Sequence, residues 1–593
     1  MFKTSFKQIV KNTWLFQYKK MQDYKSIRAM CYNKLKDDEK PTRFLLCRKS
    51  GTTLKNKVDQ LEYMLKKISI RIDGKCLFQS WIDTGIYVYS HYSITDNTSP
   101  DYRIILNSSI KDLLGQCDLS EEFGKEEYRF ISAVSAYIDR IIQSINNIID
   151  KENDKTKVRN LNISKDFFEN MKTMKALSLE EGLQRIVFWS SLFWQTQHRL
   201  VGIGRLDKIL DGLKLPDTEE KTVSVIKDFY IAMHKYYPFK SNNLLGDTGQ
   251  IIILGGREPD GTYFSNQLTY SFIKASIGQK LPDPKLLLRV CSDMPEELLE
   301  MSIKCIATGI GYPLLANDDR IIPAIKPIYG DYEAYDYVTS ACWEPLVYGK
   351  SLDKNNLSGL NFASSFVQTY LNDKFDRCVS KEEIVKLYLE CLESELKRVE
   401  NKINKINWEA DPLASLFMSK CLSHNKDISI GGAEYNNYGV LGVGLGNVIN
   451  SILGISELTF NLKKYTLTEL KNACINNYDG YDDVIRHLKS FDYYGTDDEK
   501  AISLTKEIVE FVYNYFKQYK NKFGGVLKFG LSASNYKESG DGTKATMDGR
   551  KDGEPLGVHI SSHGSNAYTG LVNFASQLNY DDIRCNGNVI DFF

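Results

Sequence analysis

Apolar residues recur at helical spacing in the first third of the chain, and this spacing predicts helices at 130–149 and 179–200. Two further runs, 76–90 and 102–107, are interpreted as strands or turns instead. The N-terminal part, residues 1–213, is therefore expected to be mainly helical.

The pattern changes at 250–254, where a β-branched run closed by Gly255 and Gly256 predicts a buried strand. After it, helices alternate with short apolar runs. Helices are predicted at 295–307, 380–403 and 503–520, and strands at 321–325, 427–430 and 526–531. Pro323 restricts its run to the edge of a sheet. This alternation predicts an α/β fold whose strands enclose the site.

Composition narrows the class of partner. The 593 residues include 76 basic and 76 acidic side chains, so the charge balance gives no case for a nucleic-acid or anionic membrane surface. A small, roughly neutral molecule is the expected partner. The 12 cysteines form no C-x-x-C pair and no Cys/His cluster at zinc spacing, which argues against a structural metal and favours a reducing compartment.

No part of the sequence predicts a membrane span. Residues 1–20 mix lysines with apolar residues, without an apolar run of signal-peptide length, and predict an amphipathic surface helix. The most apolar long segment, 438–455, is rich in glycine and interrupted by Asn447 and Asn450. A span requires about 20 predominantly apolar residues, so this segment is predicted to be a closely packed helix. We expect a soluble, cytoplasmic protein.

One short stretch, 339–345, places a thiol and a carboxylate two residues apart before a proline. In an extended loop, residues i and i+2 point the same way, so Cys342 and Glu344 would face one substrate, with Pro345 stiffening the backbone beyond them. The alternative is a buried structural cysteine beside a solvated glutamate, because free cysteines are among the most buried residues. These seven residues alone do not decide between the two.

Several separated motifs occur in the order and approximate spacing of one family. They are Gly204-Arg205-Leu206-Asp207, Ile253-Leu254-Gly255-Gly256, Leu288-Arg289-Val290, Asn317-Asp318-Asp319, Cys342-Trp343-Glu344-Pro345, residues 431–439 with Gly442 and Gly444, and Asp548-Gly549-Arg550. From about 179 to 593 the chain resembles the glycyl radical enzymes of the pyruvate formate-lyase-like superfamily. The resemblance implies a barrel of two antiparallel half-barrels surrounded by helices, with the cysteine on a loop inside it. It also implies one catalytic domain over 1–593, with the barrel core at 214–593.

The resemblance assigns chemistry to the cysteine loop. In the family, the loop cysteine becomes a thiyl radical that abstracts a hydrogen atom from substrate carbon, and Cys-x-Glu is the pattern of its eliminating members. Cys342 is therefore expected to act as the radical and Glu344 as the base that deprotonates a hydroxyl, so that a carbon–oxygen or carbon–nitrogen bond breaks. Ala341 stands where pyruvate formate-lyase has a second cysteine, which disfavours acyl transfer. Carbon–carbon cleavage or decarboxylation by the same thiyl chemistry is the alternative.

Four further residues are candidates for substrate binding. Trp343 would shape the pocket beside the thiol. Asn317 and Asp318 would contact substrate, or would serve as a polar loop or cap. His198 is either an acid–base residue near the substrate or a hydrogen-bonded structural histidine. No tightly bound cofactor or metal is expected, and a homo-oligomer is left open.

The family carries its radical on a glycine in a C-terminal Arg-Val-x-Gly-Tyr-like motif, which we do not recognise in this sequence. Residues 586–593 stand where the resemblance implies a further module. We therefore expect the catalytic subunit of a two-component enzyme. A small glycyl-radical protein, activated by an iron–sulfur, S-adenosylmethionine-dependent enzyme, would supply the radical to Cys342. A truncated chain and an inactive relative that binds a metabolite or a partner are the alternatives.

Overall fold

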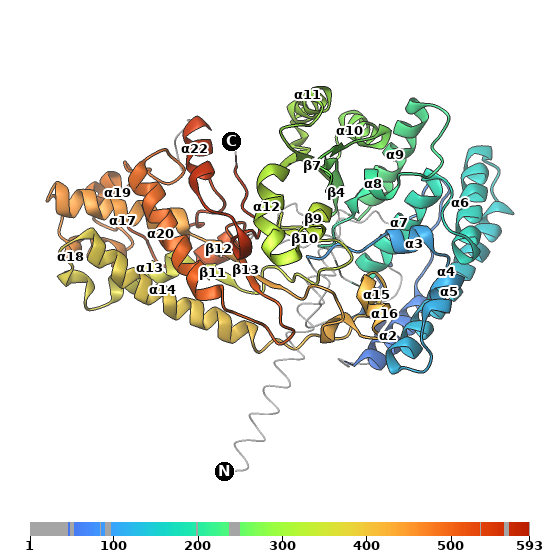
Figure 1. Cartoon of the computed structure of the whole chain (residues 1–593), viewed down its shortest axis with the longest axis horizontal. Helices are drawn as coiled ribbons and strands as arrows, with labels where there is room; N and C mark the ends of the chain where they lie inside the picture. The colour runs from blue at the N-terminus through green and yellow to red at the C-terminus, as the bar shows by residue number, and fades with distance from the viewer. Residues whose placement is uncertain are drawn as a thin grey trace, which may run out of the picture.

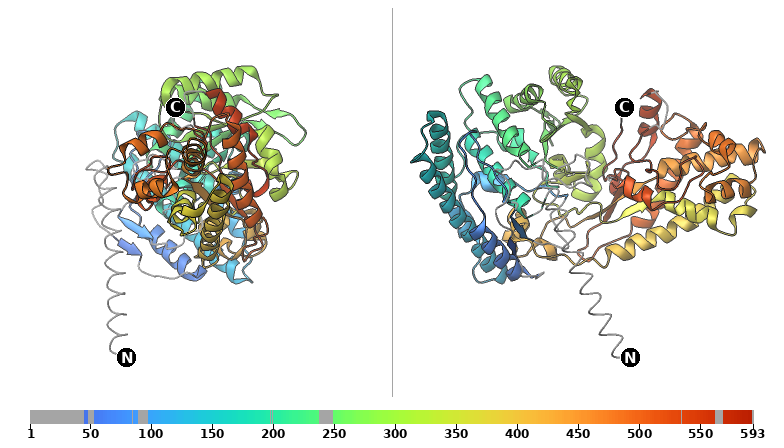
Figure 2. Two further views of the ribbon diagram at one scale, coloured as in Figure 1. Left: turned by 90° about the vertical axis from the view of Figure 1, so that its left-hand side faces the viewer. Right: turned by 180° about the vertical axis from the view of Figure 1, so that it is seen from behind.

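The computed structural model describes residues 45–47, 53–83, 85–88, 97–196, 198, 200–236, 249–533, 535–561 and 568–591. The helix predicted at 1–20 lies outside them. The described residues form two halves side by side (Figures 1 and 2). Between the halves lie helix α12 (Asp318–Tyr329) and a hairpin of β9 (Tyr337–Thr339) and β10 (Pro345–Val347).

The first half is mainly helical toward its outer side. Its helices are α2 (Leu54–Lys67), α3 (Arg103–Asn107), α4 (Ile110–Gln116), α5 (Glu122–Ile149), α6 (Lys155–Thr173), α7 (Leu179–Gln195), α8 (Leu206–Ile209), α9 (Glu219–His234), α10 (Gln267–Gln279) and α11 (Glu296–Cys305). The helices predicted at 130–149, 179–200 and 295–307 are confirmed in α5, α7 and α11. Ser178 caps α7 by accepting a hydrogen bond from the backbone of Glu181.

Four parallel strands form the sheet of this half. They are β3 (Gly204–Arg205), β4 (Ile251–Leu254), β7 (Lys285–Val290) and β8 (Leu314–Asn317), in the order β3-β4-β7-β8. Alternate residues of β4 face opposite sides: Ile252 and Leu254 join the core formed with the helices, whereas Ile251 and Ile253 pack toward β9 and β10. The strand predicted at 250–254 is confirmed, and its burial on both faces explains its continuous apolar run.

The second half packs helices around a second parallel sheet, β11 (Gly359–Asn361), β12 (Tyr438–Val443) and β13 (Leu527–Gly530). Its helices are α13 (Phe362–Leu371), α14 (Lys381–Ile403), α17 (Leu445–Ile455), α18 (Leu467–Ile475), α19 (Asp482–Leu488), α20 (Glu499–Phe516), α21 (Tyr536–Asp541) and α22 (Tyr568–Gln577). Two short helices that follow α14, α15 (Pro412–Leu416) and α16 (Ser419–Ser423), lie instead on the side of the first half, where α15 contacts α2 and α5 (Figure 1). Strand β13 and helices α14 and α20 confirm the predictions at 526–531, 380–403 and 503–520.

The edge strand predicted at 321–325 is wrong, because these residues lie inside α12. Asn317 caps this helix by accepting a hydrogen bond from the backbone of Asp319. Ile322, Ile325 and Tyr329 are buried at helical spacing on one face. A cap with acidic residues in the first turn therefore outweighed the disfavoured prolines inside the helix.

Three other predictions also differ from the structure. Segment 427–430 forms a 3-10 turn, since the Asp427 side chain accepts the backbone hydrogen bond of Ser429. Segment 438–455 is a strand followed by a helix, and Gly444, at φ 81°, makes the turn between them. Segment 102–107 is helix α3, whereas 76–90 does contain a short strand, β2 (Ile86–Val88), which pairs with β1 (Leu45–Cys47).

The hairpin between the halves brings the cysteine loop into the interior. Strands β9 and β10 are antiparallel, with Thr339 paired to Pro345. Between these two residues, Ala341 and Cys342 pack against the inner side of β12 and against Ala533, which follows β13. The cysteine loop therefore lies at the junction of the two sheets.

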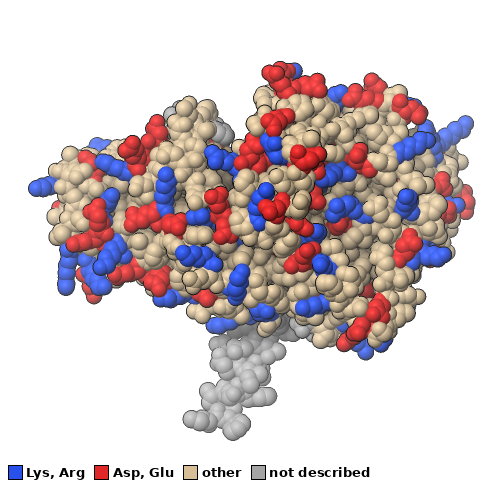
Figure 3. Space-filling view, viewed as in Figure 1, with Lys and Arg blue, Asp and Glu red and all other residues tan. Residues whose placement is uncertain are grey.

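Charged side chains of both signs lie on the surface, as the balanced composition leads one to expect. On the face shown in Figure 3, lysine and arginine side chains are interspersed with aspartate and glutamate. Within the described ranges, no helix combines the length and the apolar character required to cross a bilayer.

Candidate active site

The cysteine loop is a tight turn. The backbone N–H of Trp343 donates to the carbonyl of Ser340 over 3.0 Å, and Trp343 has a φ of 63°. A bulky residue rarely adopts this left-handed conformation, so it is backbone strain held at the site by its surroundings. The extended loop expected from the sequence is therefore wrong, but the turn still brings the Cys342 and Glu344 side chains to one place.

Glu344 is a fully buried carboxylate with three hydrogen-bond donors. Its oxygens accept from the Ser340 hydroxyl at 2.6 Å, the Asn97 side-chain amide at 3.1 Å and the backbone N–H of Cys342 at 2.9 Å. Burial raises the pKa of the Glu344 carboxyl above its ordinary value, and the bonds from Ser340 and Asn97, with the charge of Lys528, offset part of that rise. The result is a carboxyl group that is held in place and that binds a proton more readily than an exposed glutamate.

Cys342 lies beside this carboxylate, and only 7% of its surface is exposed. The same Asn97 amide nitrogen that donates to Glu344 lies 3.5 Å from the Cys342 sulfur. Asn97 is itself fixed, because its backbone N–H donates to the Leu200 carbonyl over 2.7 Å. One side chain therefore connects the thiol to the carboxylate, and no sequence motif indicated Asn97.

A buried lysine holds the far end of the loop. The Lys528 ammonium donates to the Pro345 carbonyl and to the Tyr329 hydroxyl, each at 2.9 Å, and pairs with the Asp353 carboxylate at 3.2 Å. Lys528 and Asp353 are 1% and 0% exposed. Because Pro345 directly follows Glu344, this ion pair fixes the backbone that carries the Glu344 carboxylate.

Gly587 packs directly against the cysteine loop. A Cβ atom added to this buried glycine, whose φ is 80°, would lie 2.5 Å from the Cys342 carbonyl oxygen and 3.3 Å from the Cβ of Ser532. The Leu531 N–H donates to the Gly587 carbonyl over 3.1 Å. A Cβ on Gly530 would lie 2.0 Å from the carbonyl oxygen of Asn586. Only a glycine at this position of β13 therefore leaves room for the segment that carries Gly587 to pack against the strand.

A sequence signal for Gly587 does exist. Arg584 and Gly587 have the spacing of arginine and glycine in the Arg-Val-x-Gly-Tyr-like motif, but Cys585 and Asn588 replace the valine and the tyrosine. The segment therefore matches the motif only at its arginine and its glycine.

The other predicted substrate-binding residues have different surroundings. The indole of Trp343 lies 5.5 Å from the Lys285 ammonium, on the side of the first sheet. His198 is buried, with its Nε2 3.0 Å from the Asp411 carboxylate. Asn317 is exposed and serves as the cap of α12.

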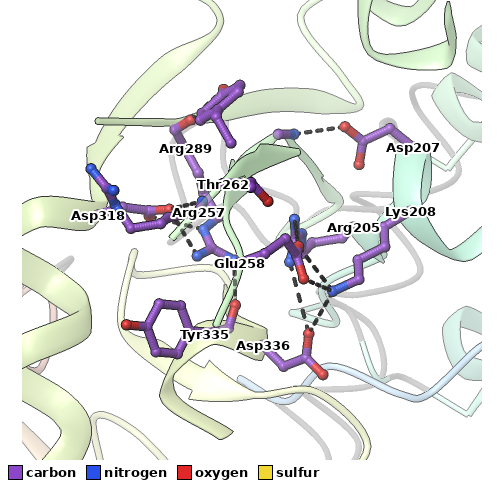
Figure 4. Close-up of polar contacts among 12 residues, drawn as sticks. Arg205, Asp207, Lys208, Arg257, Glu258, Thr262, Arg289, Asp318, Tyr335 and Asp336 are labelled. Atoms are coloured by element: carbon purple, nitrogen blue, oxygen red, sulfur yellow. Dashed lines mark hydrogen bonds and ion pairs between the residues drawn. The ribbon is translucent and has the colours of Figure 1, made fainter. Parts of the chain in front are cut away.

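Asp318 belongs to a network of ions at the carboxyl edge of the first sheet (Figure 4). Its carboxylate forms a fully buried pair with Arg289, at 2.9 and 2.8 Å, and accepts from the Tyr337 hydroxyl at 2.6 Å. Arg289 also donates to the carbonyls of Tyr335 and Tyr337. These contacts anchor the start of β9, the strand that leads into the cysteine loop. Asp318 and the Arg289 motif therefore support the loop from its base.

Metal ligation has no candidate in the part of the chain that the structure describes: no three His, Cys, Asp or Glu side chains there are grouped to hold an ion.

Comparisons with known proteins show the family of the chain. The family model described as pyruvate formate lyase-like matches residues 92–537. The chain is 25% identical to an isethionate sulfite-lyase of Nitratidesulfovibrio vulgaris, over 78% of this chain and 62% of that one. It is 26% identical to a (2S)-3-sulfopropanediol dehydratase of Klebsiella oxytoca, over 66% and 52%. The chain thus spans about half to three fifths of the length of these relatives.

The fold is also found among solved structures. The glycerol-bound B12-independent glycerol dehydratase of Clostridium butyricum superimposes with a TM-score of 0.83 at 20% identity, covering 94% of this chain and 87% of that one. With the family model matching three quarters of the sequence, this chain belongs to the pyruvate formate lyase-like family, that of the glycyl radical enzymes.

Proposed function

We propose that this chain catalyses a radical elimination from a small hydroxylated molecule, with Cys342 as the hydrogen-atom carrier and Glu344 as the base. The observation that carries this proposal is the Asn97 amide, which lies within hydrogen-bonding distance of both the thiol and the carboxylate in a closed core. Two groups that act on one substrate must be held at fixed separation, and a shared buried hydrogen-bond donor does that.

The chemistry at each residue then balances. The Cys342 sulfur, with its hydrogen removed, takes a hydrogen atom from the carbon that bears the hydroxyl, so a C–H bond breaks and an S–H bond forms. Glu344 takes the hydroxyl proton, which strengthens electron donation from that carbon. The bond to a leaving group on the next carbon breaks, and the leaving group keeps the electron pair. Cys342 finally returns the hydrogen atom to the product carbon.

The relatives support elimination more than carbon–carbon cleavage. Their names describe loss of sulfite from isethionate and dehydration of a sulfopropanediol, in which a leaving group departs from a small hydroxylated molecule. We extend the same reaction class to this chain, with oxygen, nitrogen or sulfur at the broken bond.

A glycyl radical is what removes the hydrogen atom from the cysteine. A separate small radical-bearing protein, as expected from the sequence, is one source. Gly587 of the same chain is the other, and its contact with the Cys342 carbonyl favours it. In either case a radical S-adenosylmethionine activating enzyme is the partner that forms the radical. For the hydrogen atom to pass from the Cys342 sulfur to the glycyl radical, the α-carbon of that glycine must lie at van der Waals distance from the sulfur.

The architecture fits this assignment. We propose that the parallel sheets β3-β4-β7-β8 and β11-β12-β13 are parts of the two half-barrels of one catalytic domain, with the cysteine loop between them. Enclosure in this way excludes water and oxygen from a thiyl radical, and a reducing, oxygen-poor cytoplasm is the compartment that suits it.

The experiment is anaerobic turnover of the activated chain with a panel of small vicinal diols, hydroxysulfonates and amino alcohols, followed by product analysis. We expect an aldehyde or ketone and the free leaving group from the wild type, and no turnover from Cys342→Ala. Cys378→Ala, a change at a partly exposed cysteine in the second half of the chain, is the matched control and should retain activity.

Each other result has a distinct meaning. If the products are those of carbon–carbon cleavage, the chain catalyses carbon–carbon cleavage by the same thiyl chemistry and not elimination. Full turnover by Cys342→Ala would refute the assignment of the thiol. Binding of a panel member without conversion by an activated wild type would indicate a binding protein instead.

A further inference from the structure

Three side chains beside Gly587 form a connected line. The Ser532 hydroxyl lies 3.2 Å from Nε2 of His559, and Nδ1 of His559 lies 2.5 Å from the Asp591 carboxylate. In this order a carboxylate orients an imidazole, and the imidazole exchanges a proton with a hydroxyl. The reaction described above uses none of the three.

The hydroxyl end of this line is at the active site. Ser532 lies two residues beyond the end of β13. Its Cβ and the Cys342 carbonyl oxygen flank the point that a Cβ on Gly587 would occupy, at 3.3 and 2.5 Å. The next residue, Ala533, packs in the same small core as Cys342. Ser532 is therefore a neighbour of the cysteine loop across Gly587.

The other end reaches water. Ser532 is 3% exposed, whereas the side chains of His559 and Asp591 are 23% and 25% exposed. A line of hydrogen-bonding groups that begins buried at a site and ends in solvent is able to carry protons between them.

The imidazole is held in place at a conformational cost. His559 has a φ of 62°, a left-handed conformation that is uncommon outside glycine. Its N–H donates to the Leu531 carbonyl over 3.0 Å, and its carbonyl accepts from the Tyr494 hydroxyl at 3.3 Å. Two backbone contacts thus fix the residue between Ser532 and Asp591. Strain maintained in this way is typical of functional positions.

We propose that the line Ser532–His559–Asp591 is the acid that protonates the leaving group. This inference rests on the proposed elimination and supplies the proton donor that the reaction still lacks. As the bond to the leaving group breaks, the Ser532 hydroxyl gives its proton to that group, and His559 Nε2–H replaces it. Asp591 stays a carboxylate that stabilises the imidazolium. His559 then takes a proton from water, in balance with the one that Glu344 releases.

The test compares two substrates that share a two-carbon skeleton and a hydroxyl group but differ in the leaving group. Ethane-1,2-diol must lose hydroxide, which requires a proton, whereas 2-chloroethanol loses chloride, which does not. The variants are Ser532→Ala and His559→Asn, the second chosen because asparagine tolerates a positive φ. Ser561→Ala is the control, because this serine is also buried but its hydroxyl donates to the Val558 carbonyl.

We expect both relay variants to convert ethane-1,2-diol at least ~100-fold more slowly than the wild type, the usual loss when a general acid is removed. Conversion of 2-chloroethanol should change by only a few-fold, and Ser561→Ala should behave as the wild type with both. A merely structural role would lower both rates alike, and that result would overturn the relay alone. Failure of the activated wild type to convert these two compounds and every member of the panel above would overturn the elimination and, with it, the relay.

Discussion

Lys528→Met removes one partner of the buried ion pair behind the cysteine loop. In the wild type the ammonium compensates Asp353, which is fully buried, and donates to the Pro345 carbonyl. Methionine fills similar space but leaves the carboxylate with no compensating cation. Breaking a buried pair on one side costs about 3–5 kcal/mol, and we expect this loss in the free energy of unfolding.

Urea titration followed by circular dichroism measures that loss. The double variant Lys528→Met/Asp353→Leu should recover most of it, since no buried charge is then left unpaired. Lys544→Met is the control: its pair with Asp552 is exposed on the lysine side and should contribute no more than about 1 kcal/mol. A loss below about 1 kcal/mol for Lys528→Met would refute this account, and so would a double variant no more stable than the single one.

The same variant has a predicted pH dependence. Burial raises the pKa of Asp353, and the charge of Lys528 lowers it in part. Without Lys528 the pKa of Asp353 rises further. A carboxyl whose pKa is higher in the folded state than in the unfolded state favours folding more as the pH falls. The stability gap between wild type and Lys528→Met should therefore narrow as the pH is lowered toward the ordinary aspartate pKa of 3.8.

Three further predictions concern the site itself. Because burial raises the pKa of Glu344, the wild type should lose unfolding free energy relative to Glu344→Gln as the pH rises above the ordinary value of 4.5, in urea titrations at several pH values. Gly587→Ala should be less stable than Gly553→Ala by about 1–3 kcal/mol, since both have a positive φ but only the first places a Cβ against the Cys342 carbonyl; equal losses would contradict the contact. Asn97→Ala should lower turnover more than ~10-fold while leaving substrate affinity within a few-fold, measured as kcat and KM, and an unchanged kcat would contradict its positioning role.

The sequence predicted those elements whose pattern of apolar and polar residues is compatible with only one secondary structure. Strand β4 is apolar at every position because it is buried on both faces, and α14 combines a capping serine with a long helical stripe. Residues 321–325 have no such single reading. Their isoleucines suit a strand or a helix, and the decision came from the Asn317 cap and the packing of the neighbouring residues.

The residues of the site also fall into two groups, those that could be predicted from the sequence and those that only the fold brings together. Cys342 and Glu344 are neighbours in the sequence, so their pairing was visible in the chain and the family resemblance gave it meaning. Asn97 reaches Cys342 across 245 positions, and no local pattern encodes such a contact. Ser532, His559 and Asp591 are likewise brought together only by the fold. For Asp318 the sequence left two roles open, substrate contact or a polar loop or cap, and only the fold shows that its contacts hold the base of the loop.

Electron paramagnetic resonance of the anaerobically activated chain tests the central claim most directly. Incubated alone with a radical S-adenosylmethionine activating enzyme, the chain should acquire a carbon radical split by one α-hydrogen. The splitting should collapse when the protein is labelled with deuterated glycine, and the signal should be absent in Gly587→Ala but present in the control Gly553→Ala. A radical that persists in Gly587→Ala would contradict Gly587 as the source of the radical. Turnover at Cys342 that requires the radical of a second polypeptide would also contradict it and would favour the separate radical-bearing protein.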